Sequence, residues 1–355
     1  DVKLKDRLPV SHKFDIKTSN FYLNNRKIFI QKINELFIKH FQEIKEDKTK
    51  ISCDKDDNSK FSLLTHQKVI KDYFNLYTPY RGLLLYHGLG SGKTCSSIAL
   101  AEGMKNDKNI ILLTPASLKM NFFSELKKCG DEIYKINQFW EFISIEGKSE
   151  YINILSQTLS LPTDYIKKNG GAWLVNVNKA SNFKNLSNTD QKNIDEQINH
   201  MIRTKYIDIN YNAPNLSKII SSLSSNFTKN PFDNCVIVID EAHNFVSRIV
   251  NQINNKRKGG MLELYDLIMK ANNAKIVLLT GTPIINYPSE IGVLYNLLRG
   301  YITTWTIPIE WDKKDKMDVN KLLTIFDEGK LKTHDVVEYS NNKIQITRNP
   351  FGFVN

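Results

Sequence analysis

Four short apolar runs, each followed at once by small or polar residues, stand out along the chain. They cover residues 83–86, 109–113, 235–239 and 275–279. A continuous apolar run of this length is typical of a strand that is buried on both faces, as in parallel sheets. Residues 94–102 and 244–253 have the three- and four-residue spacing of helices and follow two of these runs. The pattern predicts an α/β fold with a central, mostly parallel sheet.

The N-terminal part shows a different pattern, an apolar stripe at helical spacing. The stripe consists of Phe29, Ile33, Leu36, Phe37, Phe41 and Ile44, and Asn24 or Asn25 is placed to cap the helix start. Such an amphipathic helix can lie on a membrane surface or pack on the following domain, and we expect packing. Residues 45–60, rich in Lys and Asp, indicate an exposed linker.

The remaining chain divides into a main lobe and two less readable stretches. We expect a helical extension with a linker at 1–60, an α/β lobe at 61–300 and a linker at 301–355. Within the lobe, residues 131–230 read as an insertion with strands at 173–177 and 206–209. The basic residues Lys179, Lys184, Arg203 and Lys205 are scattered there. They are compatible with contact to nucleic acid and equally with ordinary solvation. In the last stretch, a helix near 318–327 and a strand at 343–348 are expected.

Composition narrows the class of protein. The 355 residues, 41% hydrophobic and 25% charged, describe an ordinary globular protein with about two domains. No apolar run is long enough to cross a bilayer, and the first residues lack a secretory signal, so we expect an intracellular protein without membrane contact. The net charge of +11 favours a polyanionic partner, although the codon bias of an AT-rich genome would also produce it. The four cysteines are far apart in sequence and are expected to be reduced thiols.

The most informative stretch, residues 82–94, joins an apolar strand to a helix through a glycine-rich turn. The turn contains Gly88, Gly90, Ser91 and Gly92, whose backbone N–H groups can cradle phosphates at a helix N-terminus. Lys93 would reach the β- and γ-phosphates of ATP, and the Thr94 hydroxyl would ligate Mg²⁺. His87 stands where the general phosphate-loop pattern has its first glycine.

A second signal follows the apolar run 235–239, where Asp240 and Glu241 stand side by side. A buried strand would deliver both carboxylates to the sheet edge. Asp240 would hold Mg²⁺, usually through water, and Glu241 would orient and deprotonate the attacking water. Together with Lys93 and Thr94, this pair predicts a phosphoryl-transfer site.

Upstream of the phosphate loop, a helix is expected to begin at Phe61 and run towards Tyr77. Its Gln67 has a side-chain amide that can donate and accept hydrogen bonds, as the edge of adenine requires. An ordinary surface role for Gln67 remains equally open.

Polar residues at other strand ends are candidates for binding a nucleic-acid backbone. They are Thr114, Pro115, Ser117 and Lys119 after one strand and Thr280 and Thr282 after another. Plain strand capping would explain them as well. The basic loop 256–260 could contact nucleic acid but fits a solvent-facing charge run better.

The motifs together resemble superfamily 2 helicases. His66-Gln67, residues 87–94, Thr114 to Ser117, the DEAH box 240–243 and the Thr-Gly-Thr-Pro sequence 280–283 occur in that superfamily's order. The Thr-Gly-Thr-Pro form is similar to the Snf2-related translocases. The resemblance implies a RecA-like P-loop lobe that binds ATP and Mg²⁺ and acts on DNA, or on RNA.

Residues 78–88, 95–98, 22–29, 211–213 and 349–353 resemble a narrower group. This group contains ATPases of large DNA viruses related to poxvirus nucleoside-triphosphate phosphohydrolase I and the early transcription factor small subunit. The resemblance implies a DNA-dependent ATPase that acts in transcription with the viral RNA polymerase or its factors, in the host cytoplasm or the virion. The family's second RecA-like lobe, with its arginine finger, is absent from these 355 residues. We therefore expect a fragment, or a second lobe in another chain.

Overall fold

The computed structural model describes most of the chain. The described residues are Arg7, 26–47, 64–75, 78, 80–88, 90–256, 259–302, 304–310, 317–331 and 334–348. The predicted cap at Asn24 or Asn25, most of the predicted linker 45–60 and residues 349–353 lie outside them.

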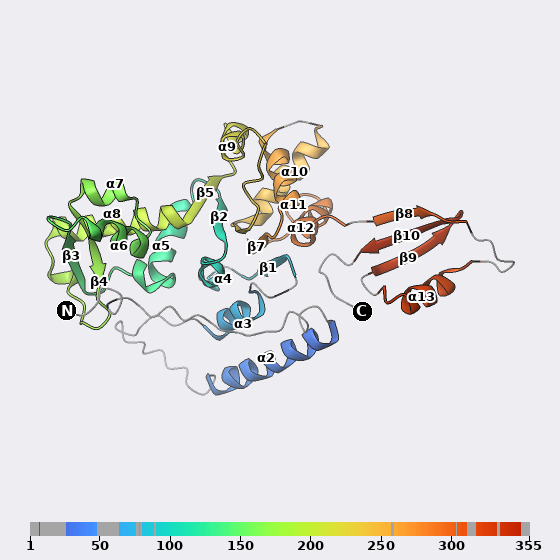
Figure 1. The fold of residues 1–355 in the computed structure, drawn as a ribbon, viewed down its shortest axis with the longest axis horizontal. Coiled ribbons are helices and arrows are strands. Elements are labelled where there is room, and N and C mark those ends of the chain that lie inside the picture. The colour runs from blue at the N-terminus through green and yellow to red at the C-terminus, as the bar shows by residue number, and fades with distance from the viewer. Residues whose placement is uncertain are drawn as a thin grey trace.

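A five-stranded parallel sheet forms the centre of the molecule (Figure 1). Its strands, in spatial order, are β1 (Gly82–Tyr86), β7 (Lys275–Thr280), β6 (Cys235–Ile239), β2 (Asn109–Thr114) and β5 (Tyr206–Asn210). All residues of β6 and β7 are buried, as their continuous apolar pattern predicts. The α/β class with a RecA-like parallel sheet is confirmed.

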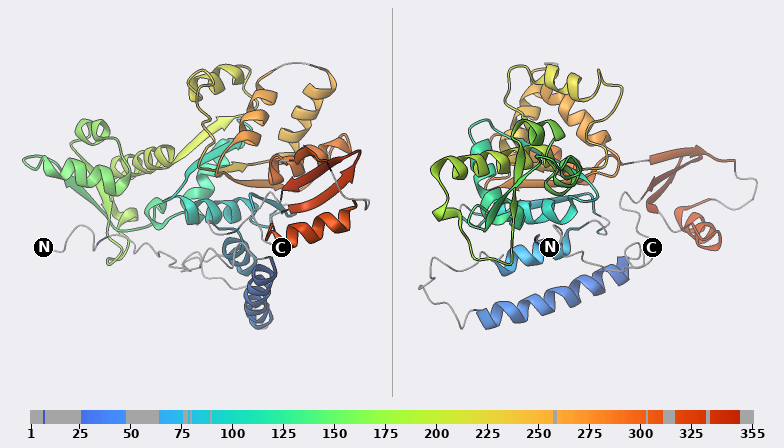
Figure 2. Two further views of the ribbon diagram at one scale, coloured as in Figure 1. Left: turned by 45° about the vertical axis from the view of Figure 1, so that its right-hand side comes forward. Right: turned by 60° about the vertical axis from the view of Figure 1, so that its left-hand side comes forward.

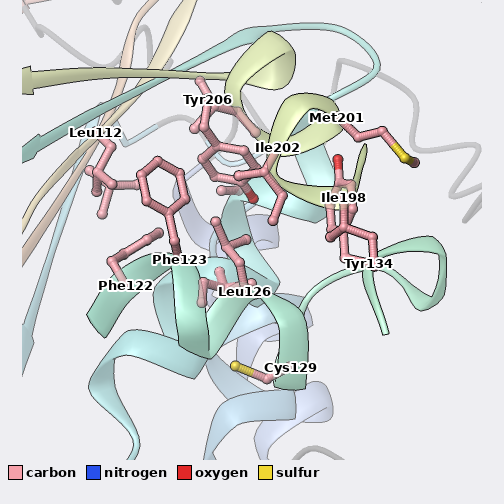
Figure 3. Packing of buried hydrophobic residues seen from close by; sticks show 14 of the residues in the cluster. Leu112, Phe122, Phe123, Leu126, Cys129, Tyr134, Ile198, Met201, Ile202 and Tyr206 are labelled. Carbon is pink, nitrogen blue, oxygen red and sulfur yellow. The ribbon is translucent and has the colours of Figure 1, made fainter. Parts of the chain in front are cut away.

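Helices cover both faces of this sheet, because alternate residues of each strand point to opposite sides. Val236 and Val238 of β6 belong to one core, together with α4 (Lys93–Met104), α5 (Lys119–Cys129) and α8 (Asn188–Lys205). Figure 3 shows part of this core, with Phe122, Phe123 and Leu126 of α5 facing Ile198 and Ile202 of α8. Ile237 and Ile239 belong to the second core, formed with α9 (Leu216–Leu223), α10 (Ala242–Asn254), α11 (Gly260–Lys270) and α12 (Ser289–Arg299).

The predicted insertion 131–230 is shorter in the structure. Its own module contains the antiparallel pair β3 (Trp140–Ser144) and β4 (Gly171–Val175), with α6 (Glu150–Leu159), α7 (Thr163–Lys168) and two 3-10 turns at Glu132–Tyr134 and Phe183–Asn185. The module extends to one side of the sheet (Figure 2). From Tyr206 onwards the chain rejoins the lobe, since β5 pairs with β2 and α9 packs in the second core. The strand predicted at 173–177 therefore exists as β4, but outside the central sheet.

Two N-terminal helices, α2 (Arg26–Asp47) and α3 (Thr65–Tyr73), lie against each other. The Phe29 ring is 5.7 Å from Tyr80, and the Phe37 ring is 6.2 Å from Tyr73. The expected packing of the amphipathic helix on the following domain is thus confirmed for this part of its stripe. Ile38 and Phe41 remain mostly exposed. Within the described residues, no helix combines the length and apolar content needed to span a bilayer.

Residues 304–348 correct the expectation of a linker. They fold into a three-stranded antiparallel sheet, in the order β8 (Thr304–Pro308), β10 (Lys343–Arg348) and β9 (His334–Ser340), with α13 (Val319–Glu328) on one face. Leu322 and Phe326 of the helix pack on Val337 and Ile344 of the sheet. We call residues 304–348 the C-terminal module. The helix and the last strand were predicted, but not that they pack together.

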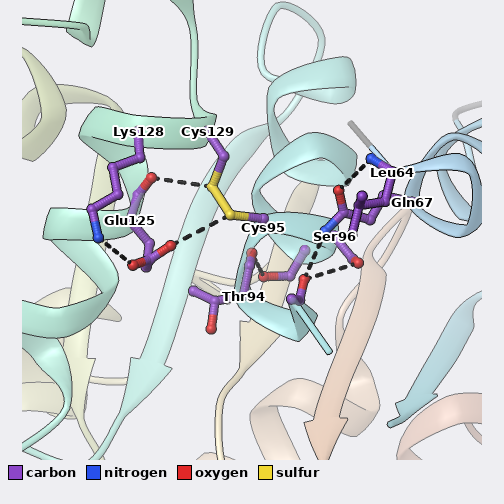
Figure 4. Close-up of a disulfide and its surroundings, with 10 residues drawn as sticks. Leu64, Gln67, Thr94, Cys95, Ser96, Glu125, Lys128 and Cys129 are labelled. Atoms are coloured by element: carbon purple, nitrogen blue, oxygen red, sulfur yellow. Dashed lines mark hydrogen bonds and ion pairs between the residues drawn. A yellow bond between two sulfur atoms is a disulfide. The ribbon is translucent and has the colours of Figure 1, made fainter. Parts of the chain in front are cut away.

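The expectation of four reduced thiols is also wrong. Cys95 in α4 and Cys129 in α5 form a disulfide, with their Cα atoms 5.7 Å apart (Figure 4). The two helices pack side by side and bring together cysteines that are 34 positions apart in sequence. Among the described residues, Cys235 is the free cysteine, and it is buried.

Candidate nucleotide and nucleic-acid site

The carboxyl ends of the five parallel strands form one edge of the sheet, and the predicted motifs follow these ends. In spatial order the edge carries residues 87–94 after β1, 280–283 after β7, 240–243 after β6, 114–119 after β2 and 210–215 after β5. Open α/β sheets bind ligands at this edge. Lys93 and Asp240 lie close enough there to interact: burial raises the pKa of the Asp240 carboxyl, and the Lys93 ammonium partly opposes this rise.

The phosphate loop, residues 87–92, depends on glycine at two positions. Gly90 has a φ of 76° and Gly92 a φ of 77°, a left-handed conformation that favours glycine. Gly92 is also the N-cap of α4, and a Cβ atom there would lie 2.6 Å from the Gln67 amide nitrogen. A larger residue at position 92 would therefore be strained in its backbone and would displace the Gln67 side chain.

Lys93 and Ser91 are held by the backbone of the phosphate loop. The Lys93 ammonium donates to the carbonyl oxygens of His87 at 2.8 Å and Gly88 at 3.4 Å. The Ser91 hydroxyl donates to the Gly88 carbonyl at 2.8 Å. Thr94 lies in the first turn of α4, where the helix dipole favours an anion. The predicted phosphate ligands thus converge on one loop and one helix N-terminus.

Helix α3 supports the phosphate loop from one side (Figure 4). The Gln67 amide is buried, donates to the Gly92 carbonyl at 3.2 Å and accepts from the Leu64 N–H at 2.9 Å. The His66 ring is 3.1 Å from the Ser91 carbonyl oxygen. Gln67 therefore is not an ordinary surface residue. Contact between Gln67 and adenine stays a prediction.

His87, at the position of the missing glycine, stands next to the charged groups of the loop. Its ring lies 5.8 Å from that of His66. Burial, followed by the nearby His66 and Lys93 charges, lowers the pKa of His87, so the imidazole is neutral at pH 7.

Asp240 and Glu241 occupy the turn between β6 and α10. Burial, and then the Glu241 charge, raise the pKa of Asp240 to about 6, although the Glu241 N–H donates to its carboxylate at 3.0 Å. Glu241 is the N-cap of α10 and has a left-handed backbone, with a φ of 48°. A non-glycine residue in this region stores strain, which is frequent at functional sites.

Thr94 and Asp240 fit a magnesium ion by the chemistry of their donors. A hydroxyl and a carboxylate are hard oxygen ligands, and a cation would offset the half-burial and the Glu241 charge that raise the pKa of Asp240. The described residues contain another cluster with metal-ligand spacing, Cys95, Glu125 and Cys129. Its two sulfurs are joined in the disulfide, so it does not fit a metal ion in this state.

His243 connects the DEAH box to the end of β7. Its Nδ1 atom is 3.3 Å from the Glu241 carboxylate and 2.9 Å from the Thr280 hydroxyl. The Thr280 hydroxyl also accepts from the Thr282 N–H at 3.0 Å. Thr280 is completely buried and links the carboxylates to the 280–283 turn, whereas Thr282 is exposed.

The six predicted nucleic-acid residues share the edge but differ in access. Ser117 and Thr282 are exposed and Lys119 is half-buried, whereas Thr114, Pro115 and Thr280 are buried. The Lys119 ammonium pairs with Asp208 of β5 at 2.5 Å. Of these six residues, only Ser117, Lys119 and Thr282 can therefore contact a polymer through their side chains in this conformation.

Residues 210–213, at the end of β5 and directly after it, also belong to the edge, and the chemistry of single residues did not reveal them. Asn210 pairs with Thr114 in the sheet register, and the buried Tyr211 hydroxyl donates to the Asp240 and Glu241 carbonyls. The only sequence signal was the similarity of residues 211–213 to viral ATPases.

Comparison with known proteins agrees with this geometry. The family described as type III restriction enzyme, res subunit (ResIII), matches residues 60–285. The chain belongs to the ResIII family. The match covers every motif from Gln67 to Thr282 and confirms the resemblance to superfamily 2 helicases.

The ResIII chain is similar to proteins of large DNA viruses. It is 30% identical over 243 residues to the "Putative ATP-dependent RNA helicase R563" of Acanthamoeba polyphaga mimivirus, covering 68% of this chain and 33% of that protein. It is 29% identical over 241 residues to a "Termination factor NPH-I homolog" of African swine fever virus, covering 68% of this chain and 25% of that protein. The chain thus spans a third or less of the length of these relatives.

A solved structure of the Sulfolobus solfataricus SWI2/SNF2 ATPase core in complex with dsDNA shows a distant likeness. The sequence identity is 15% and the TM-score 0.34, over 70% of this chain and 38% of that one. These values are too low to support a conclusion about the substrate.

Proposed function

We propose that this ResIII chain is the ATP-binding lobe of a DNA-dependent ATPase that translocates on DNA during viral transcription. The observation that carries the proposal is the meeting of Lys93, Thr94, Asp240 and Glu241 at one sheet edge, although β7 separates β1 from β6. A binding scaffold has no physical need for this complete set of phosphoryl-transfer groups.

In this proposal the loop amides and Lys93 bind the β- and γ-phosphates. Thr94 and Asp240 hold Mg²⁺, which supplies charge neutralisation at the phosphates when it is bound. Glu241 orients a water molecule and accepts its proton, and Gln67 and its helix keep the loop in place. An arginine from a second lobe can contribute roughly 10³ to 10⁵ in rate, so this lobe alone should bind ATP and hydrolyse it slowly.

The transcription role rests on the similarity to the termination factor homologue, and translocation rests on the resemblance of the Thr-Gly-Thr-Pro turn to Snf2-related translocases. Viral RNA polymerase or transcription factor subunits are the proposed partners, and the host cytoplasm or the virion is the proposed location. The similarity to a named RNA helicase favours RNA as a second candidate substrate. A non-catalytic nucleic-acid or polymerase-binding scaffold is the alternative of a different class.

Calorimetric titration of this chain with ATP in the presence of Mg²⁺ tests the proposal. Wild type should bind ATP, and Lys93→Ala should weaken binding at least about tenfold, because a charge-assisted contact to phosphate is lost. Lys127→Ala is a matched control, since Lys127 pairs with Asp195 away from the loop. The proposal would be overturned if neither ATP nor ADP binds to the wild type, or if Lys93→Ala binds ATP as tightly as the wild type does.

The choice of polymer is tested on the full-length protein. ATP hydrolysis should rise when duplex DNA is added, and RNA of the same length should give a weaker effect. Stimulation by RNA alone would transfer the proposal to the RNA helicase candidate. Unchanged biological activity of full-length Glu241→Gln would favour the scaffold.

A further inference from the structure

Tyr211 is a buried tyrosine whose side chain reaches from the loop after β5 to the backbone of the DEAH box. It follows β5 directly and is only 1% exposed. Its ring meets the Phe245 ring of α10 edge to face, with centroids 5.4 Å apart. Tyr211 therefore packs under the helix that begins at the DEAH box, although it follows the edge strand β5, which β2 separates from β6.

The Tyr211 hydroxyl holds the backbone that carries the catalytic carboxylates. It donates to the carbonyl oxygens of Asp240 at 3.1 Å and Glu241 at 3.3 Å. Burial, followed by the Asp240 and Glu241 charges, raises the pKa of Tyr211, so the hydroxyl keeps its proton at physiological pH. The bond is made to the turn in which Glu241 has its left-handed backbone.

The loop that carries Tyr211 is itself fixed next to the predicted polymer-binding residues. The Asn210 side chain accepts from the Asn212 N–H at 2.9 Å, and the Asn210 carbonyl accepts from the Ala213 N–H at 3.1 Å. Since β5 pairs with β2, this loop lies beside residues 114–119. The Asn212 side-chain oxygen is buried and has no hydrogen-bond partner within the described residues.

We propose that Tyr211 is a positioning residue for ATP hydrolysis. It ties the loop 210–213, at the end of the sheet edge that also carries the predicted polymer-binding residues 114–119, to the backbone of Asp240 and Glu241. A polymer that settles on this end then fixes the Glu241 carboxylate against its water through the Tyr211 hydroxyl. The inference rests on the proposed function and adds a residue that contacts neither ATP nor polymer.

Tyr211→Phe in the full-length protein tests the inference, because it keeps the ring on Phe245 and removes only the hydroxyl. The kcat of DNA-stimulated hydrolysis should fall on the order of tenfold, since small misplacement of a reacting group is costly. The ratio of stimulated to basal hydrolysis should fall as well. The KM for ATP and the Kd for DNA should stay within about twofold of wild type.

Tyr206→Phe is the matched control. Tyr206 lies at the other end of β5, is equally buried, and donates to the Glu102 carboxylate at 2.6 Å. It should lower the melting temperature without changing the stimulation ratio. Thermal melting of both variants separates loss of fold from loss of positioning.

Three results would overturn the inference. If DNA stimulates ATP hydrolysis by Tyr211→Phe as strongly as by the wild type, the hydroxyl has no positioning role. An equal fall of the stimulation ratio and of the melting temperature in Tyr211→Phe and Tyr206→Phe would reduce Tyr211 to a structural residue. Failure of DNA and RNA to stimulate the wild type would instead overturn the proposed function, and this inference with it.

Discussion

The central sheet and the C-terminal module are both built from short strands, but their strands obey different patterns. Those of the central sheet are parallel, and β6 and β7 are buried on both faces. Those of the C-terminal module are antiparallel, with one face on α13, and every residue of β8 is exposed. In the sequence, a strand of the central sheet is seen as a continuous apolar run. The strands of the C-terminal module have a weaker hydrophobic pattern, which resembles that of a linker.

The difference also decides where chemistry occurs. Parallel strands end at one edge, so residues from distant parts of the chain meet there. In the C-terminal module neighbouring strands run in opposite directions, and the buried core consists of Leu322, Phe326, Val337 and Ile344. The central sheet therefore supplies a site, and the module supplies a small fold with a separate core.

Glu241→Gln should have the largest effect. It should lower ATP hydrolysis at the edge of the central sheet and leave the C-terminal module unchanged. ATP hydrolysis should fall roughly 10²- to 10⁴-fold because the general base is lost, while ATP binding stays intact. Phosphate release by the full-length protein measures this, with the exposed Glu150→Gln as control. A fall of less than tenfold would remove Glu241 from the role of base.

Phe326→Ala should act only on the C-terminal module. Truncating a core phenylalanine costs about 3–5 kcal/mol, which is large for a core of this size. Hydrogen exchange should accelerate in β8, β9 and β10 and stay unchanged in β6 and β7. A parallel loss of ATP affinity would show that the two regions are not independent.

Cys129→Ser should destabilise the central sheet by about 3–4 kcal/mol under oxidising conditions, because the disulfide spans 34 positions and restricts the unfolded chain. Chemical unfolding monitors the change. A thiol reductant should lower the stability of wild type towards that of the variant and leave the variant itself unaffected. Equal wild-type stability with and without reductant would contradict a stabilising disulfide.

Lys275, the first residue of β7, should have a smaller effect on the free energy of unfolding, and this effect should depend on pH. Burial lowers the pKa of Lys275 from 10.5 to about 8, although its ammonium donates to the Tyr80 carbonyl at 2.8 Å. Between these values the unfolded chain binds more protons than the native protein, so stability rises with pH. The gain from pH 8 to 10 is at most about 3 kcal/mol.

Urea unfolding of wild type and Lys275→Met over this pH range measures the Lys275 contribution as a difference. The variant should lack the rise, because its side chain does not titrate. Identical pH dependence in the two proteins would show that Lys275 is charged in the folded state.

The sequence by itself determined the α/β class, four of the five strands of the central sheet and the residues of the phosphate loop and DEAH box. It did so because a buried parallel strand must be apolar throughout, and because a phosphate-binding turn needs glycine, lysine and a hydroxyl in fixed order. The packing of Phe29 and Phe37 followed in the same way from helical spacing.

Only the tertiary structure decided which distant residues touch. The Cys95–Cys129 disulfide depends on α4 lying beside α5, and the role of β5 depends on its return to the sheet after a separate module. The bond from Tyr211 to the catalytic turn and the burial of Thr114 and Thr280 depend on strand order and side-chain packing. These are long-range contacts, and local sequence pattern carries no signal for them.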